Sequence, residues 1–262
     1  MSSDHRTVLL DKIARHQARV GVVGLGYVGL PLACALAEET VGVVGVDVDA
    51  AKVAQINAGE SYVGDVPAAQ VRALVEAGKL RATTAYAELA PMDAIIICVP
   101  TPLSKTRDPD ISYIVSAADE IGRILRPGQL VVLESTTYPG TTEEILLPRL
   151  AQGQHAVGRD FFLAFSPERI DPGNQHYNIR NTPKVLGGMT PTCLAVAQAL
   201  YGLIVEWVVP VSSTRAAEMV KLLENTFRAV NIGLINEVAL MCHRLGISVW
   251  EVIEAATTKP YG

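Results

Sequence analysis

The 262-residue chain lacks the features that mark several broad classes of protein. Lys and Arg form no block, and the net charge is −5, which argues against a surface for nucleic acid or for an anionic membrane. The polar N-terminus has no signal-peptide core, and no apolar run approaches the roughly 20 residues of a membrane helix. These absences predict a cytoplasmic protein that binds neither nucleic acid nor membrane.

Cysteine and histidine are scarce and scattered. Four cysteines show neither a Cys-x-x-Cys motif nor paired spacing, so we expect reduced thiols packed mostly in the core: Cys34, Cys98, Cys193 and Cys242. The five histidines lack the spacing of metal ligands. The sequence therefore predicts no metal site.

A glycine-rich stretch near the N-terminus is the clearest motif in the chain. Gly24, Gly26 and Gly29 follow a short apolar run and precede a helix-compatible run, residues 30–39. In a strand–turn–helix dinucleotide site, such glycines make the tight turn, let the backbone approach the pyrophosphate, and allow close helix–strand packing. A second apolar run ends on Asp47, which would accept hydrogen bonds from a ribose hydroxyl and repel a 2′-phosphate. The pattern predicts NAD as the cofactor, in preference to NADP.

Apolar runs of strand length alternate with segments of helical periodicity as far as residue 211. This alternation predicts an α/β fold, a Rossmann-like doubly wound parallel sheet with right-handed crossovers. Within it, the spacing of Thr141 and Glu144 fits a capping box. After residue 211 no strand pattern returns, and a long helix is followed by a short one. We therefore expect an NAD-binding domain over residues 1–211 and the start of a helical dimerisation domain over 212–262.

Four stretches directly follow predicted strands, and ligands bind at these ends in an open parallel sheet. They are the glycine loop and residues 99–102, 134–137 and 166–169. Taken alone, Thr101 and Thr136 are more typical of turn capping. A salt bridge at the rim is an equally good explanation of Glu168 and Arg169.

Three polar residues, Lys221, Asn225 and Arg228, share one face of the predicted long helix because they are spaced i, i+4 and i+7. A polar stripe is usually the solvated side of a helix. Asn is a poor choice for a merely solvated helix interior, which favours a function for Asn225. Spacing alone leaves both explanations open.

From about Arg19 to Gly262, the chain resembles the UDP-glucose/GDP-mannose dehydrogenase family. The motifs that carry the resemblance are Gly24-Leu-Gly-Tyr-Val-Gly-Leu-Pro31, Val99-Pro-Thr-Pro102, Glu134-Ser-Thr136, Phe165-Ser-Pro-Glu-Arg-Ile-Asp-Pro-Gly173 and Glu218-Met-Val-Lys-Leu-Leu-Glu-Asn225. The form Ser-Pro-Glu-Arg-Ile-Asp-Pro-Gly-Asn and the ending Ala-Ala-Thr-Thr-Lys-Pro-Tyr-Gly are most similar to its UDP-N-acetylglucosamine or N-acetylmannosamine 6-dehydrogenase branch.

The resemblance implies NAD-dependent oxidation of the C6 alcohol of a UDP-sugar, a UDP-N-acetylhexosamine or UDP-glucose, to the uronic acid, as in polysaccharide biosynthesis. It implies two successive hydride transfers, with the aldehyde captured by a cysteine thiolate and oxidised to a thioester. Thr136 would position water, and Glu168 would activate it as an acid/base. Lys221 and Asn225 would stabilise the oxyanion at C6. A homodimer through the long helix is implied as well.

The same resemblance implies a set of contacts to each ligand. The cofactor contacts would be Gly24, Leu25, Gly26, Tyr27, Val28, Gly29, Asp47, Lys52, Val99, Pro100, Thr101, Pro102, Ser135 and Thr136. The substrate contacts would be Glu168, Arg169, Ile170, Lys221, Asn225 and Arg228.

The chain departs from the family pattern at its C-terminal end. The family's nucleophilic cysteine lies in a Gly-Gly-His-Cys-like loop that follows the Lys-Pro-Tyr-Gly segment, and the sequence stops at Gly262, before that loop. The second nucleotide-binding domain of the family is not in the sequence either. We therefore expect the N-terminal part of such an enzyme, truncated, with weak NAD binding and no turnover of nucleotide sugar.

Two other functions also fit the sequence. A 6-phosphogluconate- or hydroxyacid-type NAD-dependent dehydrogenase would also place a Lys and an Asn on a long helix after a Rossmann-like domain. Such an enzyme transfers a single hydride and needs no cysteine. A non-catalytic NAD-binding or dimerisation module would instead pack its long helix against a second copy of the chain.

Overall fold

The structure, a computed structural model, describes residues 4–102, 109–169, 173–174 and 176–260. It contains two compact units, Met1–Lys221 and Leu222–Gly262. The long helix α8 (Thr214–Leu245) begins in the first unit and continues into the second. The predicted domain boundary between residues 211 and 212 stays a prediction.

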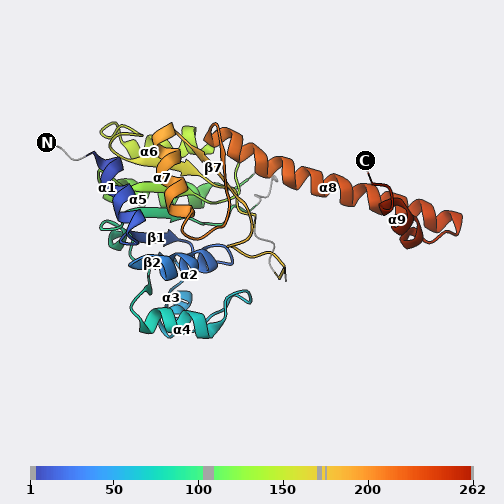
Figure 1. Ribbon diagram of the computed structural model, residues 1–262, viewed down its shortest axis with the longest axis horizontal. Coiled ribbons are helices and arrows are strands. Elements are labelled where there is room, and N and C mark those ends of the chain that lie inside the picture. Colours follow the sequence, from blue (N-terminus) through green and yellow to red (C-terminus); the bar gives the residue numbers. More distant parts are fainter. Residues whose placement is uncertain (1–3, 103–108, 170–172, 175, 261–262) are drawn as a thin grey trace. The chain divides into compact units, whose positions relative to one another are not determined.

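The first unit is built on an eight-stranded sheet (Figure 1). In chain order the strands are β1 (Arg19–Val23), β2 (Gly42–Val46), β3 (Leu80–Thr83), β4 (Ala94–Ile97), β5 (Leu130–Leu133), β6 (Phe162–Phe165), β7 (Lys184–Gly188) and β8 (Val208–Val211). Across the sheet they follow the order β3-β2-β1-β4-β5-β6-β7-β8, and all neighbours are parallel except β6 and β7. The predicted Rossmann-like architecture is confirmed, with its reversal of strand order between β1 and β4.

Strand β7 departs from the predicted all-parallel sheet. Its connection from β6 runs through residues 166–183, and the described part of this segment contains no helix. A connection that joins two strands at the same end of the sheet makes the second strand antiparallel to the first, whereas a parallel strand needs a crossover connection. In the antiparallel register Phe165 lies opposite Gly187, so Lys184 at the start of β7 falls level with Glu168.

Helices cover both faces of the sheet, which explains why the strands read as continuous apolar runs. Successive strand residues alternate between two hydrophobic cores: Ile96 packs into one, with helices α2 and α7, and Ile95 and Ile97 into the other, with helix α5. The helices of this unit are α1 (His5–Ala14), α2 (Gly29–Glu39), α3 (Ala50–Asn57), α4 (Ala68–Glu76), α5 (Ser112–Ile124), α6 (Leu147–Ala151) and α7 (Pro191–Tyr201), together with the 3₁₀ turn η1 (Tyr86–Leu89) and the π-helix η2 (Thr141–Leu146).

The second unit consists of the remainder of α8 and the short helix α9 (Val249–Thr257). Ser248 caps α9, because its side chain accepts a hydrogen bond from the backbone N–H of Glu251 at 3.5 Å. Across the described residues of both units, no helix combines the length and apolar character that crossing a membrane requires.

The predicted capping box at Thr141 is wrong. The N-cap of η2 is Gly140, in the left-handed conformation with φ of 103°, and Thr141 already lies inside the first turn. The N-terminal N–H groups are capped instead by the carboxylate of Glu218 on α8, which accepts hydrogen bonds from the backbone of Gly140 at 2.6 Å and of Thr142 at 2.9 Å. The cap is therefore supplied by a residue more than 70 positions further along the chain, and not by the neighbouring residues whose spacing suggested a capping box.

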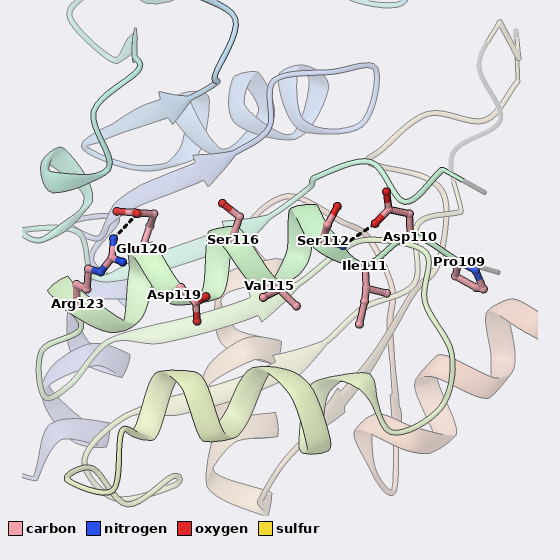
Figure 2. Close-up of a pocket in the computed structure, with 9 residues that line it drawn as sticks. All are labelled: Pro109, Asp110, Ile111, Ser112, Val115, Ser116, Asp119, Glu120 and Arg123. Carbon is pink, nitrogen blue, oxygen red and sulfur yellow. Dashed lines mark hydrogen bonds and ion pairs between the residues drawn. The ribbon is translucent and has the colours of Figure 1, made fainter. Parts of the chain in front are cut away.

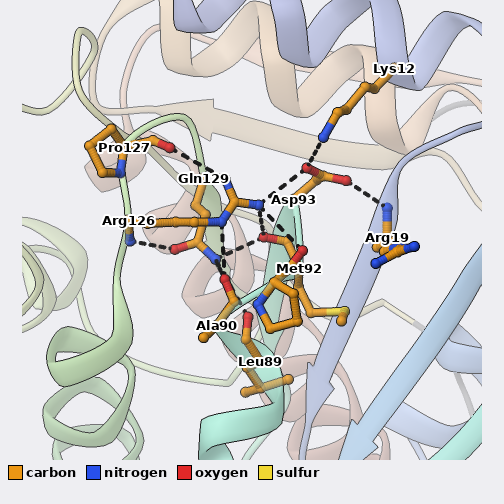
Figure 3. Close-up of polar contacts among 10 residues, drawn as sticks. Lys12, Arg19, Leu89, Ala90, Met92, Asp93, Arg126, Pro127 and Gln129 are labelled. Carbon is orange, nitrogen blue, oxygen red and sulfur yellow. Dashed lines mark hydrogen bonds and ion pairs between the residues drawn. The ribbon is translucent and has the colours of Figure 1, made fainter.

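A buried carboxylate, Asp93, joins three segments at the end of the sheet where β4 begins (Figure 3). It accepts hydrogen bonds from Lys12 Nζ at 2.7 Å, from the backbone N–H of Arg19 at 3.0 Å and from Arg126 Nη2 at 3.3 Å. Helix α1, strand β1 and the residues before β5 are thus held to one side chain. Their attachment depends on its charge.

Asp93→Asn is expected to lower the free energy of unfolding by about 1–2 kcal/mol, because the amide keeps the shape but removes the charge that Lys12 and Arg126 face. Both cationic side chains are partly exposed, at 42% and 40%, so solvent screening keeps the loss modest. Urea denaturation measures the change. The control is Glu120→Gln at an exposed ion pair, for which we expect less than about 0.5 kcal/mol. Equal stability of the two variants would contradict this role of Asp93.

Candidate active site

The three glycines of the loop after β1 meet different surroundings. Gly24 has φ of +88°, and a Cβ there would lie 2.6 Å from the carbonyl oxygen of Cys98. A Cβ at Gly29 would lie 1.8 Å from the carbonyl oxygen of Gly24. A Cβ at Gly26 would meet no described atom within 4 Å. Gly24 and Gly29 are therefore required by the packing of the chain itself, whereas Gly26 leaves open space at the start of α2.

Asp47 lies at the end of β2 and braces the glycine loop. Its Oδ2 accepts a hydrogen bond from the backbone N–H of Leu25 at 2.9 Å, and its Oδ1 accepts one from the N–H of Asp49 at 3.0 Å. Asp47 is buried, at 8% exposed, directly beside the loop. The open space at Gly26, the N-terminus of α2 and this acid together fit the pyrophosphate and ribose of a dinucleotide.

Tyr62 is a further contact to the loop that the sequence did not suggest. Its hydroxyl donates to the carbonyl oxygen of Leu25 at 2.6 Å, and Lys52 Nζ lies 5.8 Å from the centre of its ring. Burial and the nearby Asp47 raise the pKa of Tyr62, so the hydroxyl stays protonated and remains a donor. Tyr62 lies between α3 and α4 outside any periodic pattern, so no sequence signal marks it.

The four predicted strand-end stretches lie side by side, because β1, β4, β5 and β6 are consecutive in the sheet. Backbone hydrogen bonds continue past the strands, from Glu134 N to Ile97 O at 2.8 Å and from Ser166 N to Leu133 O at 3.0 Å. The hydroxyl of Ser135 donates to the carbonyl oxygen of Val99 at 2.7 Å and ties the second stretch to the third. Pro100, Pro102 and Thr136 are exposed at this rim, and Val99 and Thr101 are half-buried.

Two of the predicted catalytic residues, Glu168 and Lys221, lie together in the first unit. Lys221 Nζ donates to the backbone carbonyl oxygen of Glu168. The carboxylate of Glu168 faces Lys184, whose Nζ lies 3.6 Å from Oε2. Arg169 donates from Nη1 to the carbonyl oxygen of Pro183 at 2.7 Å. The geometry thus gathers Glu168, Arg169 and Lys221 at the end of β6.

The remaining predicted substrate contacts are not placed at this rim. Asn225 and Arg228 are exposed on α8 and belong to the second unit. Ile170 lies outside the residues that the structure describes. Their assignment stays a prediction.

A buried charge cluster behind Glu168 was not predicted. Lys184 and Glu134, 5% and 2% exposed, form an ion pair between Nζ and Oε1. The hydroxyl of the fully buried Tyr201 donates to the other oxygen of Glu134 at 2.5 Å. Burial lowers the pKa of Lys184, but the attraction of Glu134 and Glu168 outweighs it, so the pKa is raised and the amine stays charged. In the sequence, the cluster is marked by Lys184, a lysine at the start of an otherwise apolar strand, and no partner for it is evident there.

All four cysteines are free and buried, as predicted. Burial, together with Glu38, raises the pKa of Cys34 to about 12. Burial and the charges of Glu134 and Glu168 also raise the pKa of Cys98, which lies at the end of β4. A nucleophilic thiol needs access and a lowered pKa, so Cys34 and Cys98 are unsuited to covalent catalysis.

A shallow groove runs along α5 and the residues before it, where the backbone N–H of Asp110 donates to the carbonyl oxygen of Pro102 at 2.8 Å (Figure 2). It is lined by Pro109, Asp110, Ile111, Ser112, Val115, Ser116, Asp119, Glu120 and Arg123. Asp110 accepts a hydrogen bond from the backbone N–H of Ser112 at 2.9 Å and so holds the first turn of the helix. The groove contains none of the predicted site residues, and the chemistry is concentrated at the strand ends instead.

Comparison with known proteins finds one enzyme family that matches most of the chain. The NAD binding domain of the UDP-glucose/GDP-mannose dehydrogenase family matches residues 18–205, and the central domain of that family matches residues 215–262. UDP-N-acetyl-D-mannosamine dehydrogenase of Salmonella typhi is 42% identical over 249 residues, which cover 92% of this chain and 59% of that protein. The chain thus spans about three fifths of the length of that relative.

Solved structures of proteins with related sequences have a similar fold. The UDP-D-ManNAc dehydrogenase of Pyrococcus horikoshii superposes with a TM-score of 0.87 and 38% identity, covering 93% of this chain and 58% of that one. A ternary complex of GDP-mannose dehydrogenase from Pseudomonas aeruginosa gives a TM-score of 0.84 with 27% identity, covering 92% and 57%. This chain therefore belongs to the UDP-glucose/GDP-mannose dehydrogenase family.

Proposed function

We propose that the chain carries the cofactor site and part of the catalytic site of an NAD-dependent dehydrogenase that oxidises C6 of a UDP-N-acetylhexosamine. One observation carries this function: a dinucleotide-type glycine loop lies in the same row of strand ends as Glu168, which Lys221 contacts. The match of residues 18–205 to an NAD binding domain supports the cofactor. The names of the relatives, UDP-N-acetyl-D-mannosamine dehydrogenases, support the sugar.

The residues at the rim have complementary chemistry for this reaction. The ammonium of Lys221 stabilises negative charge on the C6 oxygen as hydride leaves. Glu168, buried at the end of β6, accepts a proton from water or alcohol and returns it later. The hydroxyl of Thr136 is exposed at the neighbouring strand end and positions the water. Asn225 and Arg228 join these residues by family resemblance alone.

The proposed enzyme needs two further parts, a reactive thiol and a second copy of the chain. The thiol that carries the thioester is assigned to the portion of the relatives that this chain does not span, since its own four cysteines are buried. A homodimer is supported by exposed apolar side chains along α8 in the second unit, which are Leu223, Phe227, Val230, Ile232, Leu234, Ile235, Leu240, Met241 and Leu245. A cytoplasmic location stays a prediction.

The cofactor assignment is tested by titrating the chain with NADH and NADPH and following nicotinamide fluorescence. NADH is expected to bind at least about tenfold more tightly, because Asp47 repels a 2′-phosphate. In Asp47→Asn the repulsion is lost, and the ratio of the two affinities is expected to fall toward one. Equal affinities in the unsubstituted chain would contradict the NAD preference. Reduction of NAD⁺ by a 3-hydroxy acid would contradict the proposed substrate and favour the single-hydride alternative.

A further inference from the structure

The peptide that joins Leu25 to Gly26 in the glycine loop is held from several sides by the protein itself. The backbone N–H of Leu25 donates to Asp47 Oδ2 at 2.9 Å, and the carbonyl oxygen of Leu25 accepts from the Tyr62 hydroxyl at 2.6 Å. Leu25 is 1% exposed and packs on strand β2, since a Cβ at Gly45 would lie 2.7 Å from Leu25 Cδ1. Leu25 is therefore fixed at its N–H, at its carbonyl group and at its side chain.

One backbone donor of residues 24–26 is left unused among the residues that the structure describes, and it is the N–H of Gly26. The N–H of Gly24 donates to the carbonyl oxygen of Val46 at 2.7 Å, and the carbonyl oxygen of Gly26 accepts from the N–H of Leu30 at 3.0 Å. Backbone donors in folded proteins are normally paired with protein, water or ligand. The Gly26 N–H is therefore available to a bound group.

The direction of this N–H depends on the carbonyl group of the same peptide. In a planar trans peptide, the carbonyl of one residue and the N–H of the next point to opposite sides. Because the carbonyl of Leu25 points to Tyr62, the N–H of Gly26 points away from Tyr62. If this peptide turned over, a carbonyl oxygen would take the place of the donor and would repel a phosphate. The hydrogen bond from Tyr62 opposes that rotation.

The ring of Tyr62 makes a second contact, with a residue of helix α3. Lys52 Nζ lies 5.8 Å from the centre of the ring, within the range of a cation–π interaction. Lys52 is one of the cofactor contacts that the family resemblance implies. Tyr62 lies between α3 and α4, so a single side chain outside the glycine loop contacts both the loop and Lys52.

We propose that Tyr62 is a positioning residue for NAD. Its hydroxyl holds the Leu25–Gly26 peptide in the orientation that presents the Gly26 N–H to the pyrophosphate, and its ring holds the ammonium of Lys52. The inference rests on the proposed function, because the pyrophosphate is that of the proposed cofactor. The contact of the hydroxyl with the loop is a property of the folded chain and can be measured without cofactor. A hydroxyl that served only to pair the carbonyl of Leu25 would stabilise the fold and leave the affinity for NADH unchanged.

Tyr62→Phe tests the proposal, since it removes the hydroxyl and keeps the ring that Lys52 contacts. In the free chain, hydrogen exchange of the Leu25 N–H, followed by NMR, is expected to be about tenfold faster, because the loop opens more readily without this hydrogen bond. NADH is expected to bind about tenfold more weakly, at a temperature where melting curves show the variant to be folded. ADP-ribose contains the same pyrophosphate without nicotinamide, so its affinity is expected to fall by a similar factor.

Two further variants complete the test. Tyr113→Phe removes the hydroxyl of an exposed tyrosine on α5 that is not among the predicted contacts, and is expected to change neither exchange nor affinity. Tyr62→Leu also removes the ring, so NADH is expected to bind more weakly still, because Lys52 loses its contact.

NADH affinity in Tyr62→Phe equal to that of the unsubstituted chain would overturn the proposal, even if exchange of the Leu25 N–H were faster, because Tyr62 would then be a structural contact only. Unchanged exchange would overturn it too, since the hydroxyl would not hold the loop. The failure of the proposed function is a separate result, in which the unsubstituted chain itself binds no NADH. Exchange in Tyr62→Phe would then still decide whether the hydroxyl holds the loop.

Discussion

Gly26→Ala is expected to fold with the stability of the unsubstituted chain and to bind NADH at least about a hundredfold more weakly. The added methyl group meets no described atom within 4 Å, so the protein alone does not resist it. The same space lies at the N-terminus of α2, where a pyrophosphate would approach the backbone N–H groups. A methyl group there blocks that approach.

Two other glycines make the test specific. At Gly29 the added carbon would lie 1.8 Å from the carbonyl oxygen of Gly24, so Gly29→Ala is expected to destabilise the fold itself. At Gly64 nothing lies within 4 Å, and Gly64→Ala is expected to change neither stability nor NADH binding. Thermal melting and fluorescence titration of the three variants separate the two effects. NADH affinity in Gly26→Ala equal to that of Gly64→Ala would refute the placement of the pyrophosphate.

Glu218→Ala is expected to lower the free energy of unfolding by about 3 kcal/mol. The carboxylate is fully buried and accepts hydrogen bonds from Gly140 N at 2.6 Å, from Thr142 N at 2.9 Å and from Thr142 Oγ1 at 2.7 Å. Its charge lies at the N-terminal, positive end of η2. Removing it leaves the donors buried and unsatisfied, which costs more than the hydrogen bonds themselves contribute.

Urea denaturation measures this loss, and two variants calibrate it. Glu218→Gln keeps the volume and one acceptor oxygen, so an intermediate loss is expected. Glu237→Ala, at an exposed position of the same helix, is expected to change stability by less than about 0.5 kcal/mol. If Glu218→Ala were as stable as Glu237→Ala, the cap would contribute nothing. Because Lys221 follows Glu218 by about one helical turn, the cap also fixes the part of α8 that carries Lys221.

The cofactor half of the site could be predicted because its chemistry is local in sequence. Gly24, Gly26 and Gly29 must stand at fixed spacing, and Asp47 must end the next strand. The positions of the other three stretches followed from the alternation of strands and helices, since parallel strands place their carboxyl ends at one edge. These predictions needed no knowledge of distant contacts.

The parts that could not be predicted depend on contacts between distant segments. The cap of η2 comes from Glu218, not from Thr141, because a buried carboxylate satisfies more donors than the local hydroxyl. Lys184 reaches Glu134 and Glu168 only because β7 is antiparallel to β6, a reversal that strand periodicity does not encode. Nothing in the sequence marks Tyr201 as the neighbour of Glu134.

The reversal at β7 also bears on how related proteins can diverge. Both ends of the segment from residue 166 to residue 183 are anchored at one edge of the sheet, by the pairing of β6 with β7. Insertions and deletions between residues 173 and 182 therefore leave Glu168 and Lys184 opposite each other. The length of this loop can therefore change during evolution while the contacts of Lys184 with Glu134 and Glu168 stay in place.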